Sequence, residues 1–273
     1  VYDHGVDIGV TAAAGDNGVS GTVVSRDPRY VTSPLHSISP AVNRSLSLTA
    51  PGIPEEGIAI PQTAAEFNSL GGDWTVEAWF HSGAPAGQTG GLIRKLAGQH
   101  VAFELGLVEG VPHVRFETAE GIEVKATAAA PVPAGAWTHL AGVWDGALRV
   151  LRLYVNGNTV FEDASCADHD DMTPVSGFGP MALGTGAAWS DAHLDEVRIW
   201  GMTRNQVSID RARWERLPVD APGLVRNFRF DDGGMSVEDF VHPGWQNAQT
   251  YALKADAYGI QDGDGDGTAD WVV

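Results

Sequence analysis

The chain of 273 residues is long enough for one large β domain or two smaller ones, and an apolar share of 43% is ordinary for a protein with a buried core. The formal net charge of −18 makes nucleic acid and anionic membranes poor partners and divalent cations good ones, although the same charge also serves solubility. Cys166 is the only cysteine, which excludes an intrachain disulfide and a zinc site built on several cysteines. No apolar run approaches the roughly 20 residues that cross a bilayer, so membrane insertion is not expected.

Residues 1–42 are rich in Gly, Ser and Pro, and turn signals such as Gly15-Asp16-Asn17-Gly18 separate short β-prone pieces. We expect an extended segment whose strands pair with the body of the protein or with a neighbouring molecule. If it added a strand to the edge of a neighbour's sheet, this segment would make the protein self-associate.

From residue 43 onward the sequence predicts many short strands. Residues Trp74 to Phe80 alternate with period two, which places Trp74, Val76, Ala78 and Phe80 on one face. Asn156-Gly157 ends the strand that begins at Leu148 and predicts a tight hairpin, because both positions tolerate positive φ. Other strands are expected at Leu46–Leu48, Gly90–Arg94, Val101–Leu107, Val111–Thr118, Ile122–Thr127, Trp137–Asp145, Met181–Gly184, Leu194–Trp200 and Leu224–Phe230. This pattern is typical of an all-β sandwich or barrel.

One short helix is predicted between the last two strands of this series. Thr203 is a suitable N-cap, and apolar residues recur at near-helical spacing from Val207 to Trp214, before Pro218.

Five segments in this order resemble the laminin-G-like domains of the concanavalin-A-like superfamily. They are residues 74–80 (WTVEAWF), 92–95 (LIRK), 135–146 (GAWTHLAGVWDG), 153–157 (LYVNG) and 193–200 (HLDEVRIW). The resemblance covers about residues 43–230 and implies a two-sheet jelly-roll sandwich. It also implies roles in glycan binding, adhesion or spacing along large extracellular proteins. Residues 223–240 resemble a strand and acidic loop of bacterial multi-domain surface proteins, so we expect 231–261 to form an acidic loop and return segment.

Residues 262–273 resemble a truncated, Asp-rich calcium-binding repeat. Position 6 of this loop holds Gly267, as in an EF hand, whereas Val273 stands where the bidentate Glu would be. Alternating carboxylates on a tight loop supply the oxygen ligands that calcium needs, although a solvated acidic linker would have the same composition. The expected ligands are Asp262, Asp264, Asp266 and Asp270.

Three further aspartates are candidates for a structural calcium at the rim of the sandwich, which the resemblance implies. Asp231 and Asp239 lie in the acidic stretch after the last strand, and Asp195 lies in the segment 193–200. Turn formation and solvation explain aspartates at such positions equally well.

The sequence does not favour an enzyme. Glycosidases of the resembling fold carry Glu-x-Asp-x-x-Glu on one strand, and the segment Asp195 to Arg198 lacks this motif. Asp191 lies four residues before Asp195, roughly 13 Å along a regular strand, whereas a retaining carboxylate pair is about 5 Å apart. Nothing in the sequence indicates a bulge that would shorten this gap. We expect Glu196 and Arg198 to form a neighbouring pair on one face.

Two of the nine tryptophans are candidates for stacking on a sugar ring. Trp189 lies in the loop after residue 184, and Trp245 follows Pro243-Gly244, so strand alternation does not require either side chain to be buried. Packing against the protein is the alternative for both.

The sequence therefore favours a secreted, non-catalytic module with a structural or adhesive role in a larger, calcium-stabilised protein at the cell surface. The start at Val1 and the truncated repeat agree with excision from a longer chain. A carbohydrate-binding module that uses Trp189 or Trp245 is the alternative, and a filament subunit that assembles through residues 1–42 is a third. The expected partners are a glycan or another extracellular protein.

Overall fold

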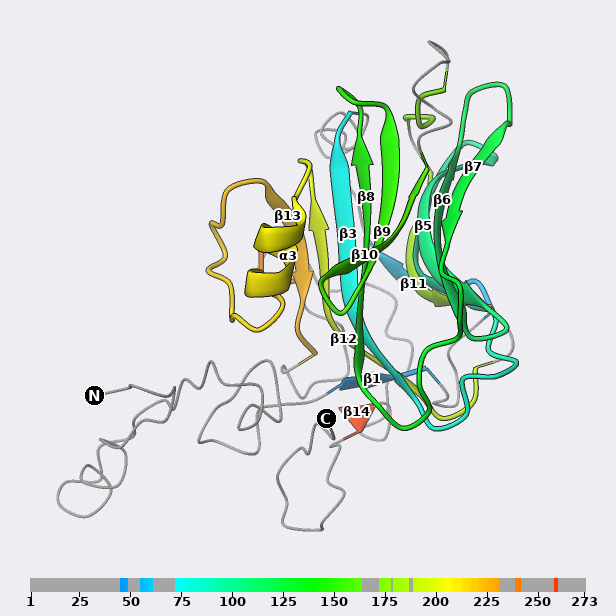
Figure 1. Ribbon diagram of the computed structural model, residues 1–273, viewed down its shortest axis with the longest axis vertical. Coiled ribbons are helices and arrows are strands. Elements are labelled where there is room, and N and C mark those ends of the chain that lie inside the picture. The colour runs from blue at the N-terminus through cyan, green and yellow to red at the C-terminus, as the bar shows by residue number, and fades with distance from the viewer. Residues whose placement is uncertain are drawn as a thin grey trace, which may run out of the picture.

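The protein is described by a computed structural model over residues 45–48, 55–60, 72–163, 172–177, 179–186, 189–230, 239–241 and 258–259. These residues form two antiparallel sheets packed face to face, with one helix outside the sandwich (Figure 1). The predicted two-sheet jelly roll with one short helix is confirmed. No helix within the described ranges is long and apolar enough to cross a bilayer.

Sheet A has eight strands. They are β1 (Ser45–Ser47), β3 (Trp74–Ser82), β8 (Thr138–Asp145), β9 (Val150–Val155), β10 (Asn158–Asp163), β12 (Ala192–Trp200), β13 (Leu224–Phe228) and β14 (Tyr258–Gly259). Their order is β10-β9-β8-β3-β12-β1-β14, and β13 pairs with the second half of β12. The segment 231–261, predicted as a loop and return, therefore contributes a two-residue strand.

Sheet B has six strands. They are β2 (Ile58–Ile60), β4 (Gly90–Ala97), β5 (His100–Val108), β6 (Val111–Glu117), β7 (Glu123–Thr127) and β11 (Met181–Thr185). Their order is β2-β11-β4-β5-β6-β7, so four strands that follow one another in sequence also lie side by side in the sheet.

The hydrophobic core lies between the two sheets. The alternate residues of β3 from Trp74 to Phe80 that were predicted to share one face are all fully buried in this core. Aromatic rings join the two sheets: the ring of Trp74 lies 5.5 Å from that of Phe103, and the ring of Trp144 lies 4.8 Å from that of Phe116. The period-two pattern thus correctly identified the inward face of β3.

The predicted hairpin at Asn156-Gly157 connects β9 and β10. Both residues have positive φ, 52° at Asn156 and 78° at Gly157. The side chain of Asn156 also accepts a hydrogen bond of 2.9 Å from the backbone N–H of His139 in β8, which ties the turn to the neighbouring strand.

The helix, α3 (Gln206–Ala212), lies on the face of sheet A that is turned away from sheet B (Figure 1). Its N-cap is Asn205, whose side chain accepts a hydrogen bond of 2.9 Å from Ser208 N. The prediction of Thr203 as N-cap was wrong by two residues, because the side chain that reaches the free N–H belongs to Asn205. Ile209 is fully buried and packs on sheet A against Ala141, Val143 and Tyr154.

Strand β12 contains a bulge that was not predicted. Its register against β3 passes from Asp195 opposite Trp79 to Arg198 opposite Glu77, and Glu196 between them has a φ of 45°. At this point the partner on the other side of β12 changes from β1 to β13. The expectation of a regular strand was therefore wrong, since β12 must adjust to two different neighbours along its length.

Candidate functional site

A groove of about 940 Å³ lies over sheet B, on the face that is turned away from sheet A. We call it the sheet B groove. Polar side chains on its floor come from β4, β5, β6 and β7, and they are Arg94, Glu104, His113, Arg115, Glu123 and Lys125.

Strand register places four of these side chains in one row. Arg94 is opposite Glu104, Glu104 is opposite Arg115, and Arg115 is opposite Lys125. Apolar sequence neighbours of these residues, such as Leu105 after Glu104 and Val114 before Arg115, belong to the core and are fully buried. We call these four residues the charged row. It crosses four adjacent strands at a right angle to their direction, since residues opposite one another in an antiparallel sheet lie side by side.

Glu104 is the centre of the charged row. Its Oε1 accepts hydrogen bonds from His113 Nε2 at 3.0 Å and from Arg115 Nε at 2.9 Å, and its Oε2 lies 3.3 Å from Arg94 Nε. Burial alone would raise the pKa of Glu104, but hydrogen bonds from His113 and Arg115 and the charge of Arg115 lower that pKa to about 2. Glu104 is therefore an ionised carboxylate whose position is fixed by its neighbours.

A glycine and a bulge shape the floor of the groove. β4 shifts register between Gly91 and Ile93, and Gly91 packs under Thr185 of β11. A Cβ at Gly91 would lie 2.6 Å from Thr185 Oγ1 and 3.4 Å from Glu104 Cγ. Only glycine lets β11 and β4 approach this closely beside Glu104.

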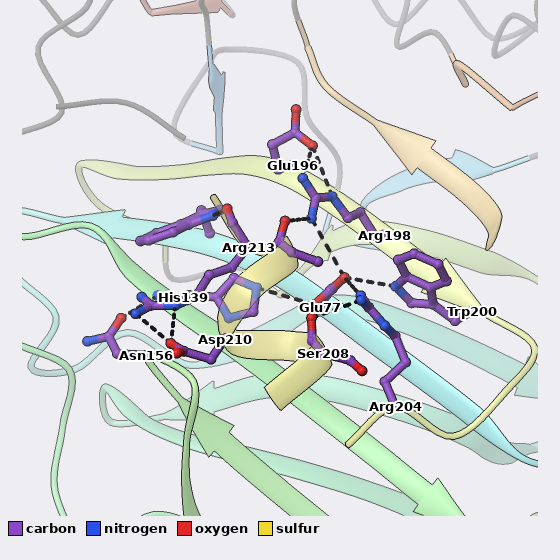
Figure 2. A network of polar contacts seen from close by, with 12 residues as sticks. Glu77, His139, Asn156, Glu196, Arg198, Trp200, Arg204, Ser208, Asp210 and Arg213 are labelled. Atoms are coloured by element: carbon purple, nitrogen blue, oxygen red, sulfur yellow. Dashed lines mark hydrogen bonds and ion pairs between the residues drawn. The ribbon is translucent and has the colours of Figure 1, made fainter. Parts of the chain in front are cut away.

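A second group of buried charges lies on the opposite side of the molecule, between sheet A and α3 (Figure 2). Glu77 is fully buried at its centre, and its Oε1 accepts hydrogen bonds from Trp200 Nε1 at 2.8 Å and Arg204 Nη1 at 2.9 Å. Burial would raise the pKa of Glu77, but His139, Arg198 and Arg204 outweigh it and lower that pKa to about 2. We call this group the α3 network.

Arg198 joins the α3 network to the end of the helix. Its Nη1 donates to Ala212 O and its Nη2 to Glu215 O, both at 2.8 Å, and Nη2 also donates to Glu196 Oε2 at 2.7 Å. The expected pair of Glu196 and Arg198 is confirmed. Because Glu77, Glu196 and Arg198 are at most 1% exposed, the network has no surface to offer a ligand. Its role is to attach α3 to sheet A, and the sheet B groove is the better candidate site.

Three residues that the sequence singled out lie within the described part of the chain. Trp189 is half-buried; its Nε1 donates to Gly184 O at 3.2 Å and its ring lies 6.0 Å from that of Phe80, outside the groove lining. Asp195 is fully buried in the bulge and its Oδ1 accepts a hydrogen bond of 2.7 Å from Glu196 N.

Asp239 is 1% exposed, and Arg226 Nη1 donates to its Oδ2 at 2.7 Å. Its Oδ1 accepts from the backbone N–H groups of Asn227 at 3.1 Å and Val241 at 3.0 Å. A calcium ion at Asp239 would therefore compete with the guanidinium of Arg226 for the same carboxylate.

The remaining predicted site residues lie outside the described residues; they are Trp245, Asp231, Asp262, Asp264, Asp266 and Asp270. Within the described ranges, no three His, Cys, Asp or Glu side chains converge as a metal ion would require.

Sequence reasoning missed the charged row, although the strands that carry it were predicted. Glu104, Arg115 and Lys125 each occupy a polar position of a period-two pattern, and that was the available signal. Such a pattern gives the face on which a residue lies but not the residue opposite it on the next strand, so the convergence of these charges was not visible.

The family model described as the concanavalin A-like lectin/glucanases superfamily (Laminin_G_3) matches residues 55–210. The chain belongs to this superfamily. All six strands of sheet B, and hence the floor of the groove, lie within the matched residues of this concanavalin A-like domain. No curated protein matches the chain.

Several solved structures resemble part of the chain at low identity. A putative carbohydrate binding protein from Bacteroides ovatus is 17% identical, with a TM-score of 0.45, over 62% of this chain and 49% of that one. The binding domain of Paraclostridial Mosquitocidal Protein 1 is 14% identical, with a TM-score of 0.43, over 53% of this chain and 37% of that one. A SAP-like pentraxin from Limulus polyphemus is 14% identical, with a TM-score of 0.39, over 55% of this chain and 71% of that one. The match spans less than half of the first two chains, and the likeness concerns the fold alone.

Proposed function

We propose that this concanavalin A-like domain is a non-catalytic binding module that recognises a carbohydrate in the sheet B groove. The observation that supports it is the charged row, a strip of hydrogen-bonding side chains along the groove in which Glu104 is held by Arg94 and Arg115. Sugar hydroxyls both donate and accept hydrogen bonds. Groups that are already fixed lose little conformational entropy when they bind such a ligand.

The state of Glu104 does not suit the general acid of a glycosidase. A glycosidase general acid needs a carboxyl group that stays protonated near neutral pH, which requires a raised pKa. The pKa of Glu104 is lowered instead, to about 2, and His113 and Arg115 occupy its Oε1. A carboxylate in this state suits a hydrogen-bond acceptor for a sugar hydroxyl better than a proton donor.

We also propose an extracellular setting and an adhesive role within a larger protein. Laminin-G-like domains are typically extracellular, which supports this location. Calcium bound by Asp262, Asp264, Asp266 and Asp270 would stiffen the connection to the next domain. Trp189 and Trp245 remain candidates for further sugar contacts.

Self-association through residues 1–42 is a separate proposal, which the sheet edges favour. Within the described residues, β7 and β10 each end their sheet and so present an edge to which a strand can be added. Light scattering should then find oligomers of the full chain and monomers of residues 43–273. Oligomers that persist without residues 1–42, or a monomeric full chain, would contradict strand addition.

A glycan array followed by calorimetry tests the proposed function. Ala182 pairs with Arg94 in register, lines the groove and is 9% exposed, so Ala182→Tyr should fill the groove. We expect this variant to lose at least tenfold in affinity for any saccharide that the protein binds. Leu148→Tyr is the matched control, since Leu148 is 59% exposed and is not part of the groove lining. A protein that binds no saccharide, or an Ala182→Tyr variant that is folded and binds normally, would refute the proposal.

A further inference from the structure

We infer that the ligand of the sheet B groove is an acidic oligosaccharide whose negative groups are bound by Arg94 and Lys125. The inference rests on the proposed function and adds the chemical class of the sugar. It follows from the way the protein distributes charge along the groove.

The carboxylates on the groove floor are already satisfied by the protein. Glu104 is bound by His113 and Arg115. Glu123 accepts a hydrogen bond of 2.8 Å from Arg115, and Glu117 beside it accepts from Arg115 at 3.3 Å and from Val101 N at 3.1 Å. A cationic ligand would have to break these contacts before it could bind here.

Two cations of the charged row are not satisfied in this way. Arg94 Nε lies 3.3 Å from Glu104 Oε2 without forming a hydrogen bond, its two terminal nitrogens have no partner among the described residues, and its side chain is 37% exposed. Lys125 is half-buried and has no partner within the described ranges. A guanidinium whose two terminal nitrogens are unpartnered and an ammonium group without a partner in the described part of the chain, both lining the groove, favour carboxylate or sulfate groups on the ligand.

The two cations lie along the charged row. Arg94 and Lys125 are separated by three steps between adjacent strands. At about 4.8 Å for each step, their backbones are about 14 Å apart. A ligand that contacts both side chains therefore runs across the strands, and acidic groups on two of its sugars match two cations at this spacing.

Two exposed glutamates at one end of the groove favour one orientation of the ligand. Glu55 and Glu56 are exposed and lie before β2, at the end of sheet B opposite to β7. They repel acidic groups at that end, so no charged sugar should extend beyond Arg94 of β4 towards β2.

A saccharide fits these features better than a nucleic acid. The net charge of −18 repels a continuous phosphate backbone, whereas two local cations can select isolated acidic groups.

The test uses the full chain and an array of matched saccharide pairs, each consisting of a uronate or sulfated oligosaccharide and its methyl-esterified or desulfated form. We expect the acidic member of a pair to bind at least tenfold more tightly than the neutral one, with a smaller difference in high salt. Calorimetry on the best acidic saccharide should then show that Arg94→Gln and Lys125→Gln each lose about tenfold, which is roughly 1.4 kcal/mol. Arg211→Gln removes one exposed charge from α3 and should change affinity less than twofold.

Three other outcomes would contradict either the inference or the proposed function. Equal or tighter binding of the neutral members would overturn the inference and leave the proposed carbohydrate function standing. Binding of single-stranded DNA as tight as that of the best acidic saccharide would overturn it in favour of a nucleic-acid site. If no saccharide of either kind binds, the proposed function itself fails.

Discussion

Two glutamates, one under each outer face of the sandwich, stay ionised although the protein buries them. Glu77 is surrounded by Arg198, Arg204 and His139, and Glu104 by Arg115 and His113. In both, burial favours the neutral acid, and neighbouring positive charges and hydrogen bonds outweigh it. The two carboxylates differ in their access to solvent, because α3 covers Glu77 whereas Glu104 lines a groove.

The lowered pKa of these residues predicts how stability depends on pH. A pKa that is lower in the folded protein than in the unfolded chain stabilises the fold above the unfolded value. This stabilisation is lost as pH falls from 4.5 towards 2. Glu104→Gln should remove on the order of 3 kcal/mol of this pH-dependent stability, measured by urea unfolding across that range. Glu123→Gln is the control, because the side chain of Glu123 is 48% exposed. An unchanged pH profile in Glu104→Gln would contradict the assignment.

The sequence allowed the ion pair of Glu196 to be predicted, but not the burial of Glu77. The pair of Glu196 with Arg198 was predicted because both residues lie within three positions of one segment. Glu77 was not recognised, because a Glu that alternates with Val76 and Ala78 has the pattern of a solvent-facing residue. Its burial depends on α3, which comes from residues more than a hundred positions later and covers that face of β3.

Among the elements, α3 depends on side chains of β3 and β12 to hold it. Arg198 occupies the carbonyls of Ala212 and Glu215, at and just beyond the helix end, and Trp79 Nε1 donates to Arg213 O at 3.1 Å. A helix of seven residues is too short to be stable alone, so these contacts and the burial of Ile209 maintain it.

Arg198→Lys should therefore loosen α3. Lysine keeps the charge near Glu77 but cannot donate to Glu196 and both carbonyls at once. We expect a loss of about 2–4 kcal/mol in the free energy of unfolding and faster amide exchange in residues 206–217. Arg211→Lys, on the exposed face of the same helix, should change stability by less than about 0.5 kcal/mol. Equal exchange in the two variants would show that Arg198 does not hold the helix.

The hairpin at Asn156-Gly157 allows steric and conformational costs to be separated. Gly157 and Gly135 have similar φ values, 78° and 69°, but a Cβ at Gly157 would collide with Asp210 of α3 whereas a Cβ at Gly135 would meet nothing within 4 Å. Gly135→Ala should cost about 1 kcal/mol for the left-handed backbone alone, and Gly157→Ala at least about 1 kcal/mol more. Thermal unfolding of both variants measures the difference, and equal losses would mean that α3 does not press on the turn.

Predictions for single elements succeeded where the signal is local. The hairpin needed only the dipeptide Asn156-Gly157, and the inward face of β3 needed only alternation. The bulge at Glu196 could not be predicted, because it reflects the change of partner strand from β1 to β13 rather than any property of its own residues.

For the whole molecule, the two-sheet sandwich was predictable from the number and order of strands, whereas the groove was not. The groove depends on register: moving β6 by two residues against β5 would keep its outward face and separate Arg115 from Glu104. Register is set by packing across the core, which no single strand reveals.

Calcium binding remains a prediction about the whole chain. If Asp262, Asp264, Asp266 and Asp270 bind the ion, millimolar calcium should raise the melting temperature and a chelator should reverse the rise, since a ligand that binds only the folded state stabilises it. Replacing all four residues by Asn should abolish the calcium response and leave the melting temperature in chelator within a few degrees of the parent. A melting temperature that does not change on addition of calcium would contradict the prediction.

The pairing of β1 links parts of the chain that are made at very different times. β1 at residues 45–47 lies between β12 and β14, and its register partners in β14 are Tyr258 and Gly259. The strands that carry the charged row, by contrast, follow one another between residues 90 and 127. During synthesis on the ribosome, the hairpins under the groove can therefore form soon after residue 127 has left the exit tunnel. Strand β1, in contrast, has both of its neighbours only after about 210 further residues have followed it.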